Sequence, residues 1–164
     1  MSALLPTLRR KLAGLRGYSA SEITMVAPSL VLLGLARLAI LFLPFRFYAR
    51  VLGTVASQGL PAPPLTAGLD NRARSIGRSV RATARITPWK SVCLPQAMVA
   101  SLLLRVGGVP HVVHFGLAPG DAKPDAAPMQ AHAWIVAGKR IVTGAPVLPE
   151  YRIVSSFASP PPAT

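Results

Sequence analysis

Cys93 is the only cysteine in the chain, and it stands where a helix can make a thiol reactive. The apolar segment from Ser91 to Arg105 predicts a helix, with Ser91 as its N-cap and Pro95 in the first turn, where a backbone N–H has no intrahelical partner. The positive end of the helix dipole favours the thiolate of Cys93 over its neutral thiol. We therefore interpret Cys93 as a candidate nucleophile rather than as a small buried residue.

A cysteine nucleophile needs a base that accepts the thiol proton and later protonates the leaving group. Three histidines follow Cys93 in the sequence. His111 and His114 lie three apart on one predicted strand, so their side chains point to opposite faces and at most one faces the cysteine. His132 begins the sequence His-Ala-Trp on a second predicted strand. The residues alone therefore indicate Cys–His chemistry, and their spacing fits no zinc motif.

The elements that must position these residues are a helix and a small antiparallel sheet. Strands are predicted over Val109–Leu117, over Ala131–Ala137 and, after a tight turn at Gly138-Lys139, over Arg140–Thr143. His132, Trp134 and Val136 should share one face of the second strand.

The N-terminal part of the sequence predicts helices. Residues 1–17 carry leucines at helical spacing among basic residues, which predicts an amphipathic helix that packs on the domain or lies on a membrane surface. Ser19 and Glu22 form a predicted capping box. The apolar run from Met25 to Phe45 is long enough to cross a bilayer, but Arg37 lies near its centre. We interpret this run as a core helix, with a membrane span or interfacial association as alternatives.

The composition indicates a basic protein of a reducing compartment. The formal net charge is +13, which predicts attraction to an acidic peptide, partner protein, anionic lipid or nucleic acid. The arginines of a predicted helix over Arg72–Arg85 form a solvated face or, as a sharper hypothesis, recognise an acidic partner. A lone cysteine forms no intramolecular disulfide, which favours a cytoplasmic location.

The pattern of composition along the chain predicts four regions, which are an N-terminal helical region (1–56), a linker (57–71), a catalytic core (72–157) and a disordered tail (158–164).

Several motifs resemble one known family when they are taken in order. They are Trp89-Lys-Ser-Val-Cys-Leu94, Gly108-Val-Pro110 and Ala131-His-Ala-Trp134, preceded by Leu43-Pro-Phe-Arg46. This arrangement resembles the transglutaminase-like B protein of lasso-peptide biosynthesis, which is the leader peptidase of that pathway. The likeness spans roughly 30–144 of the chain.

The resemblance implies an α+β fold, in which N-terminal helices precede a transglutaminase-like, papain-like cysteine-protease core with a small antiparallel sheet. It implies that Cys93 attacks the bond between leader and core in a ribosomally made precursor, with His132 as general base and then acid. The core peptide would pass to a separate ATP-dependent lasso cyclase. The expected partners are the precursor peptide, a separate leader-recognition protein and that cyclase, with no cofactor and no metal. Nucleic acid is not an expected partner, and peripheral membrane association is a further possibility.

The sequence departs from this family at the third catalytic position. The orienting aspartate usually follows the histidine by about twelve residues, and here Thr143 and Gly144 stand in that stretch. We interpret the nearby acids Asp121, Asp125 and Glu150 as surface charges. A Cys–His dyad, a backbone carbonyl or Thr143 remain as alternatives for holding the imidazole.

Two tryptophans and one backbone hydrogen-bond donor are further candidates for the site. Trp89 and Trp134 are candidates for a substrate-binding wall, with buried packing as the alternative. The Cys93 backbone N–H is a candidate oxyanion donor, and the second donor is not identified.

Two other functions fit the same residues. A basic module without chemistry would bind membranes or nucleic acid through its arginines. A thiol acyltransferase would use the same cysteine with an amine acceptor in place of water.

Overall fold

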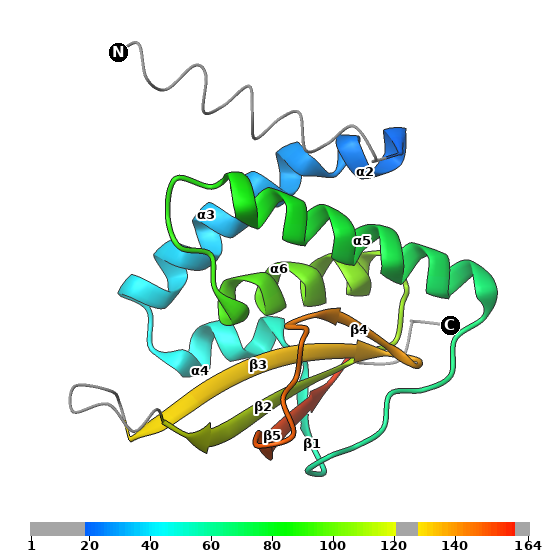
Figure 1. The fold of residues 1–164 in the computed structure, drawn as a ribbon. Coiled ribbons are helices and arrows are strands. Elements are labelled where there is room, and N and C mark those ends of the chain that lie inside the picture. The colour runs from blue at the N-terminus through cyan, green and yellow to red at the C-terminus, as the bar shows by residue number, and fades with distance from the viewer. Residues whose placement is uncertain (1–18, 121–127, 160–164) are drawn as a thin grey trace.

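The computed structural model describes residues 19–120 and 128–159, and it places helices over one face of a curved antiparallel sheet (Figure 1). The helices are α2 (Ala20–Thr24), α3 (Val26–Phe42), α4 (Phe45–Tyr48), the 3-10 turn η1 (Ala49–Val51), α5 (Ala67–Ile86) and α6 (Cys93–Val106). The strands are β1 (Thr54–Ala56), β2 (Val112–Pro119), β3 (Met129–Ala137), β4 (Arg140–Thr143) and β5 (Arg152–Ala158). The predicted α+β class with a small antiparallel sheet is confirmed.

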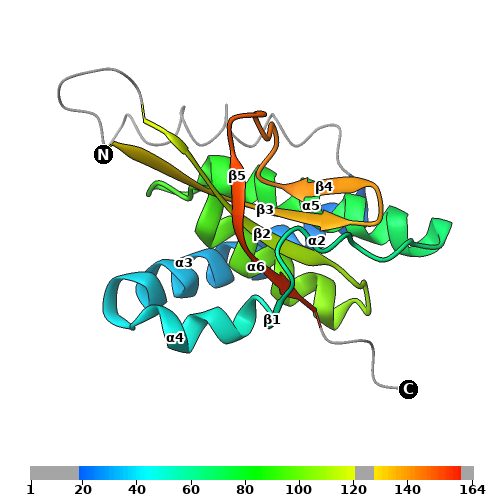
Figure 2. The ribbon, with the colours of Figure 1, turned by 90° about the horizontal axis from the view of Figure 1, so that it is seen from below.

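The sheet has five strands in the order β1-β5-β2-β3-β4, and every neighbouring pair is antiparallel. Strands β2 and β3 pair without interruption from Val112 opposite Val136 to Pro119 opposite Met129. The pairing of β3 with β4 shifts register between Ile135 and Val136. Seen from below, the sheet lies in front of the helices (Figure 2).

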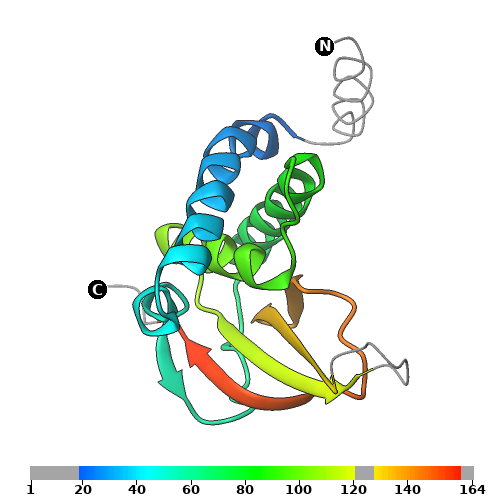
Figure 3. The same cartoon turned by 90° about the vertical axis from the view of Figure 1, so that its left-hand side faces the viewer.

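The core lies between the helices and one face of this sheet. Helices α3 and α5 lie side by side above the sheet, and α6 packs between them and the strands (Figure 3). Leu33 of α3, Ile76 of α5 and Leu104 of α6 are fully buried in this cluster together with Val113 and Ile135 of the sheet. The N-terminal helical region and the strands thus share one hydrophobic core.

Helix α3 is buried along one stripe only. Leu33 and Ala36 are in the core, whereas Val31, Leu35 and Leu38 are exposed. The predicted capping box before it is present, since Ser19 Oγ accepts the Glu22 N–H and the Glu22 carboxylate accepts the Ser19 N–H. By its length and composition alone, the segment Glu22–Phe42 could cross a membrane.

Three parts of the fold differ from the sequence-based prediction. Helix α5 begins at Ala67, inside the predicted linker, because the Thr66 hydroxyl caps its first turn. Strands β1 and β5 were not predicted, and they form by pairing with each other. Ala158, the first residue of the predicted tail, ends β5, and Ser159 bonds to His111 through backbone and side chain. Residues 1–17 and the rest of the tail lie outside the described residues.

His111 is a buried histidine between β2 and α6, bonded through both ring nitrogens. Its Nδ1 lies 2.9 Å from Val109 O, and its Nε2 lies 2.9 Å from Ser101 Oγ. Burial, together with the nearby charge of Arg105, lowers the pKa of His111 from its ordinary value. Burial also lowers the pKa of His114.

These histidines predict an acid-sensitive fold. Below about pH 6.5 the unfolded chain takes up a proton on His111 while the folded chain keeps this histidine neutral. Stability is therefore full above that pH and falls below it, by up to about 1.4 kcal/mol for each unit of pH for His111. Urea unfolding between about pH 8 and pH 5 will measure this fall. His111→Gln should flatten the dependence, and an unchanged slope in that variant would assign the acid sensitivity to other groups.

Candidate functional site

Cys93 is the first residue of α6, as the sequence predicts, and it is a free cysteine. The predicted cap was wrong, because Val92 is the N-cap and no side chain caps the helix. Ser91 is used elsewhere, since its hydroxyl lies 3.1 Å from Thr87 Oγ1 and its carbonyl accepts a hydrogen bond from Gln96 Nε2 at 2.7 Å. These bonds fix the loop that leads into α6.

The surroundings of Cys93 suit a thiol that acts at the edge of a core. The residue is partly buried and packs against the hydrophobic cluster beneath α6. An uncapped helix start leaves backbone N–H groups directed outward with no side-chain acceptor. Such N–H groups stabilise an anionic oxygen that develops beside the nucleophile.

His132 of β3 is held by a backbone carbonyl. Its Nε2 lies 2.7 Å from Gly144 O. A carbonyl oxygen only accepts hydrogen bonds, so Nε2 carries the proton and Nδ1 is left as the acceptor in the neutral ring. Two aromatic rings also contact the imidazole: Trp134 stacks on it with centroids 5.8 Å apart, and Tyr151 lies at 5.0 Å. The ring is therefore oriented with its basic nitrogen known.

The structure does not bring Cys93 and His132 into direct contact. Helix α6 packs on β3 through Ala133, Ile135 and Ala137, which belong to the core. His132 and Trp134 alternate with these residues and so lie on the opposite face of β3. Within residues 19–120 and 128–159, no hydrogen bond joins the cysteine to this histidine. The catalytic pairing of Cys93 with His132 therefore stays a prediction.

Gly144 stands twelve residues after His132, at the position where the resembled family has its orienting aspartate. Its φ is +85°, and a Cβ built there would lie 2.6 Å from both Ala133 O and Trp134 Cβ. Only glycine fits this conformation and this space. Of the three alternatives left open by the sequence, the structure thus selects a backbone carbonyl as the group that holds the imidazole.

Among the described residues, Thr143 and Glu150 form no hydrogen bond to the ring. Thr143 is fully buried, and its Oγ1 has no hydrogen-bond partner among the described residues. Glu150 is exposed. Asp121 and Asp125 lie outside the described residues.

The two tryptophans occupy different surroundings. Trp134 is 5% exposed and lies over Gly116, where a Cβ would approach the indole to 2.7 Å. The Trp134 ring stacks on the His132 imidazole. Its contact with substrate stays a prediction. Trp89 is partly buried against Gly34, and its Nε1 is a buried donor with no partner among the described residues.

The other two histidines have structural contacts on opposite sides of the sheet, as their spacing predicts. His111 bonds to Ser101 of α6, whereas His114 Nδ1 lies 2.9 Å from Ser156 Oγ of β5. In the part of the chain that is described, no group of three His, Cys, Asp or Glu residues is placed to hold a metal ion.

Sequence reasoning missed Tyr151 as a contact of His132. Tyr151 follows a proline-rich loop and precedes β5, and no local pattern connects it to a residue of β3. Its contact arises only because the loop after β4 returns across the face of the sheet.

Residues 39–156 match the sequence profile of the Transglutaminase-like superfamily. The chain belongs to the transglutaminase-like superfamily. The match begins within α3 and ends within β5, so it contains Cys93, His132 and Gly144. Searches among curated proteins and among solved structures gave no match. Membership in the transglutaminase-like superfamily suggests cysteine peptidase or acyltransferase activity for this chain.

Proposed function

We propose that this transglutaminase-like chain is a cysteine peptidase that removes the leader from a lasso-peptide precursor. The observation that carries the proposal is the position of Cys93 at the uncapped start of α6, in a chain whose superfamily uses this chemistry. The choice of substrate rests on the motifs around Cys93 and His132, which resemble those of lasso-peptide leader peptidases. The oriented imidazole of His132 supplies the base.

The reaction proceeds through an acyl-enzyme. Cys93 Sγ attacks the carbonyl carbon of the bond between leader and core, and His132 Nδ1 accepts the thiol proton. Backbone N–H groups at the start of α6 stabilise the oxyanion. His132 then protonates the leaving amine, and the core peptide departs with a new N-terminus. Water, activated by the same imidazole, hydrolyses the thioester and releases the leader.

This mechanism requires His132 Nδ1 to reach Cys93 Sγ when the precursor is bound. Catalytic hydrogen bonds are often absent without substrate and form only in the complex. The ring is anchored through Nε2 to the loop that follows β4 and is contacted by Tyr151 at the end of that loop. Because His132 lies on the face of β3 opposite α6, this pairing requires a rearrangement of β3 together with the loop that follows β4.

The proposal includes partners and a location. A separate leader-recognition protein delivers the precursor, and a separate cyclase takes the released core peptide. The work takes place in the cytoplasm, where a single thiol stays reduced. The exposed apolar residues of α3 are compatible with peripheral contact between the peptidase and a membrane.

The test uses the full chain, a candidate precursor peptide and its leader-recognition protein, with mass spectrometry of the products. Hydrolysis gives a leader with a free carboxylate and a core with a free amine. We expect His132→Ala to slow the reaction by about a hundredfold to ten-thousandfold. A leader joined to an added amine would instead establish the acyltransferase, and an intact precursor in the complete mixture would refute the peptidase.

A further inference from the structure

A cleft of about 370 Å³ between α5 and β4 is lined by five arginines. Four of them, Arg74, Arg78, Arg81 and Arg85, follow one another along one side of α5, and Arg140 faces them from β4. We call this feature the arginine cleft. Beside the cleft α5 packs closely on β4, because a Cβ at Gly77 would approach Val142 O to 2.6 Å.

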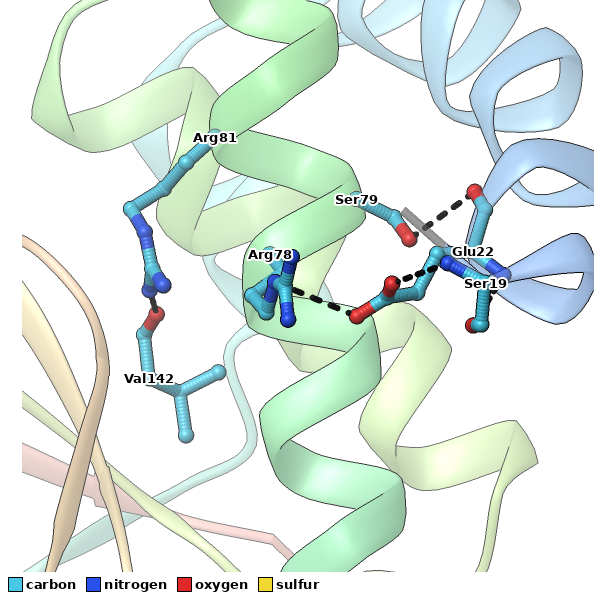
Figure 4. Close-up of polar contacts among 6 residues, drawn as sticks. All are labelled: Ser19, Glu22, Arg78, Ser79, Arg81 and Val142. Carbon is cyan, nitrogen blue, oxygen red and sulfur yellow. Dashed lines mark hydrogen bonds and ion pairs between the residues drawn. The ribbon is translucent and has the colours of Figure 1, made fainter. Parts of the chain in front are cut away.

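Internal partners hold three of these arginines in place. Arg78 Nε lies 3.3 Å from a Glu22 carboxylate oxygen, and Arg81 donates to Val142 O (Figure 4). Arg140 donates two hydrogen bonds to the Asp70 carboxylate, at 3.0 and 2.6 Å. These hydrogen bonds hold the pKa of Asp70 below its ordinary value. The middle of the cleft and its β4 wall therefore carry three guanidinium groups whose positions are fixed before any ligand arrives.

Arg74 and Arg85, at the two ends of the row, are open to a ligand. Both are exposed, and neither forms a hydrogen bond or an ion pair within residues 19–120 and 128–159, although the charge of Arg74 contributes to the lowered pKa of Asp70. They lie eleven positions apart on α5, which is about 16 Å along a helix. An extended peptide covers this length with about five residues.

The walls of the cleft suit a peptide better than a nucleic acid. Strand β4 is at the edge of the sheet, and Arg140, Ile141 and Val142 of this strand line the cleft. Ile141, which is 39% exposed, adds an apolar contact. The lining residues of the described chain include no aromatic side chain on which a base could stack. The carboxylates of Glu22 and Asp70 already show which anion these guanidinium groups accept.

We propose that the arginine cleft binds an extended peptide segment rich in glutamate or aspartate. The cleft adjoins the candidate site, since Val142 lines the cleft and Gly144, two residues further, holds His132. That this peptide is the leader of the precursor rests on the proposed function.

The test measures binding directly, with the full chain carrying Cys93→Ala so that no probe is cut. The probe is a short fluorescein-labelled peptide rich in glutamate, compared with the same peptide carrying glutamines. We expect Arg74→Gln/Arg85→Gln to weaken binding of the glutamate probe by about tenfold, measured by anisotropy. The matched control is Arg37→Gln/Arg50→Gln, which removes the same charge from exposed arginines outside the cleft.

Specific outcomes overturn the proposal. An equal loss in the control pair would reduce the effect to net charge, and equal binding of the glutamine probe would exclude carboxylate recognition. Tighter binding of a single-stranded oligonucleotide through the same two arginines would assign the cleft to nucleic acid. Precursor cleavage without binding of the acidic probe would refute the proposed peptide binding in the cleft and leave the peptidase function standing. Binding of the probe without any precursor cleavage would refute only the proposed function.

Discussion

Replacement of Cys93 by alanine will abolish precursor cleavage while leaving the fold intact. The covalent route needs the sulfur, so loss of the nucleophile should lower the rate by about a thousandfold or more. Cys93 is only partly buried at the end of α6, and its Sγ forms no hydrogen bond to another described residue. The change in the free energy of unfolding should therefore stay below about 1 kcal/mol. Product formation by mass spectrometry and thermal unfolding measure the two quantities.

The control for this prediction separates chemistry from packing. Cys93→Ser keeps the size of the side chain but replaces the thiol with a far weaker nucleophile, so it should be as inactive as Cys93→Ala. Iodoacetamide should block the wild-type chain with the addition of a single label, because there is one cysteine. Undiminished cleavage by the alanine variant would show that the reaction does not use the Cys93 thiol.

Replacement of Gly144 by alanine will release His132 and damage catalysis and stability together. At φ +85° an added Cβ is strained, and it would meet Ala133 O and Trp134 Cβ at 2.6 Å. The loop must move, and the carbonyl that holds His132 Nε2 moves with it. We expect cleavage to slow by about a hundredfold and the free energy of unfolding to fall by about 1–3 kcal/mol. Cleavage kinetics and urea unfolding provide the two measurements.

Gly108 offers a matched control for the strain. It also has a positive φ, +66°, but a Cβ there meets no atom within 4 Å, and it lies beyond the end of α6. Gly108→Ala should therefore lower stability through the backbone alone and leave cleavage by the folded chain unchanged. If Gly144→Ala cleaved the precursor at the wild-type rate, the carbonyl would have no part in orienting His132.

The same geometry explains why an aspartate cannot simply be restored. Gly144→Asp would bring a larger side chain to a position that has no room for a Cβ. The carbonyl dipole reaches the same imidazole nitrogen at 2.7 Å, but it stabilises an imidazolium less than a carboxylate would. In the proposed mechanism, the Gly144 carbonyl therefore orients His132 without adding a negative charge.

The sequence alone predicted most of the elements and placed the candidate cysteine and histidine on them. The apolar run with Pro95 in its first turn was enough to place Cys93 at the start of a helix, because helix propensity and first-turn preferences act over a few neighbouring residues. Alternation and the Gly138-Lys139 turn were enough for β3 and β4, for the same reason. The motifs around these elements were also sufficient for the superfamily.

Only the tertiary structure decided what holds these residues and what surrounds them. The Gly144 carbonyl reaches His132 because β4 pairs with β3 through a register shift and the chain then turns with a positive φ. The arginine cleft exists because α5 packs on the edge strand β4, far away in the sequence. Strand β5 owes its place to pairing with β1 and β2. Such contacts depend on how distant segments share a core and a sheet, and no short stretch of sequence specifies them.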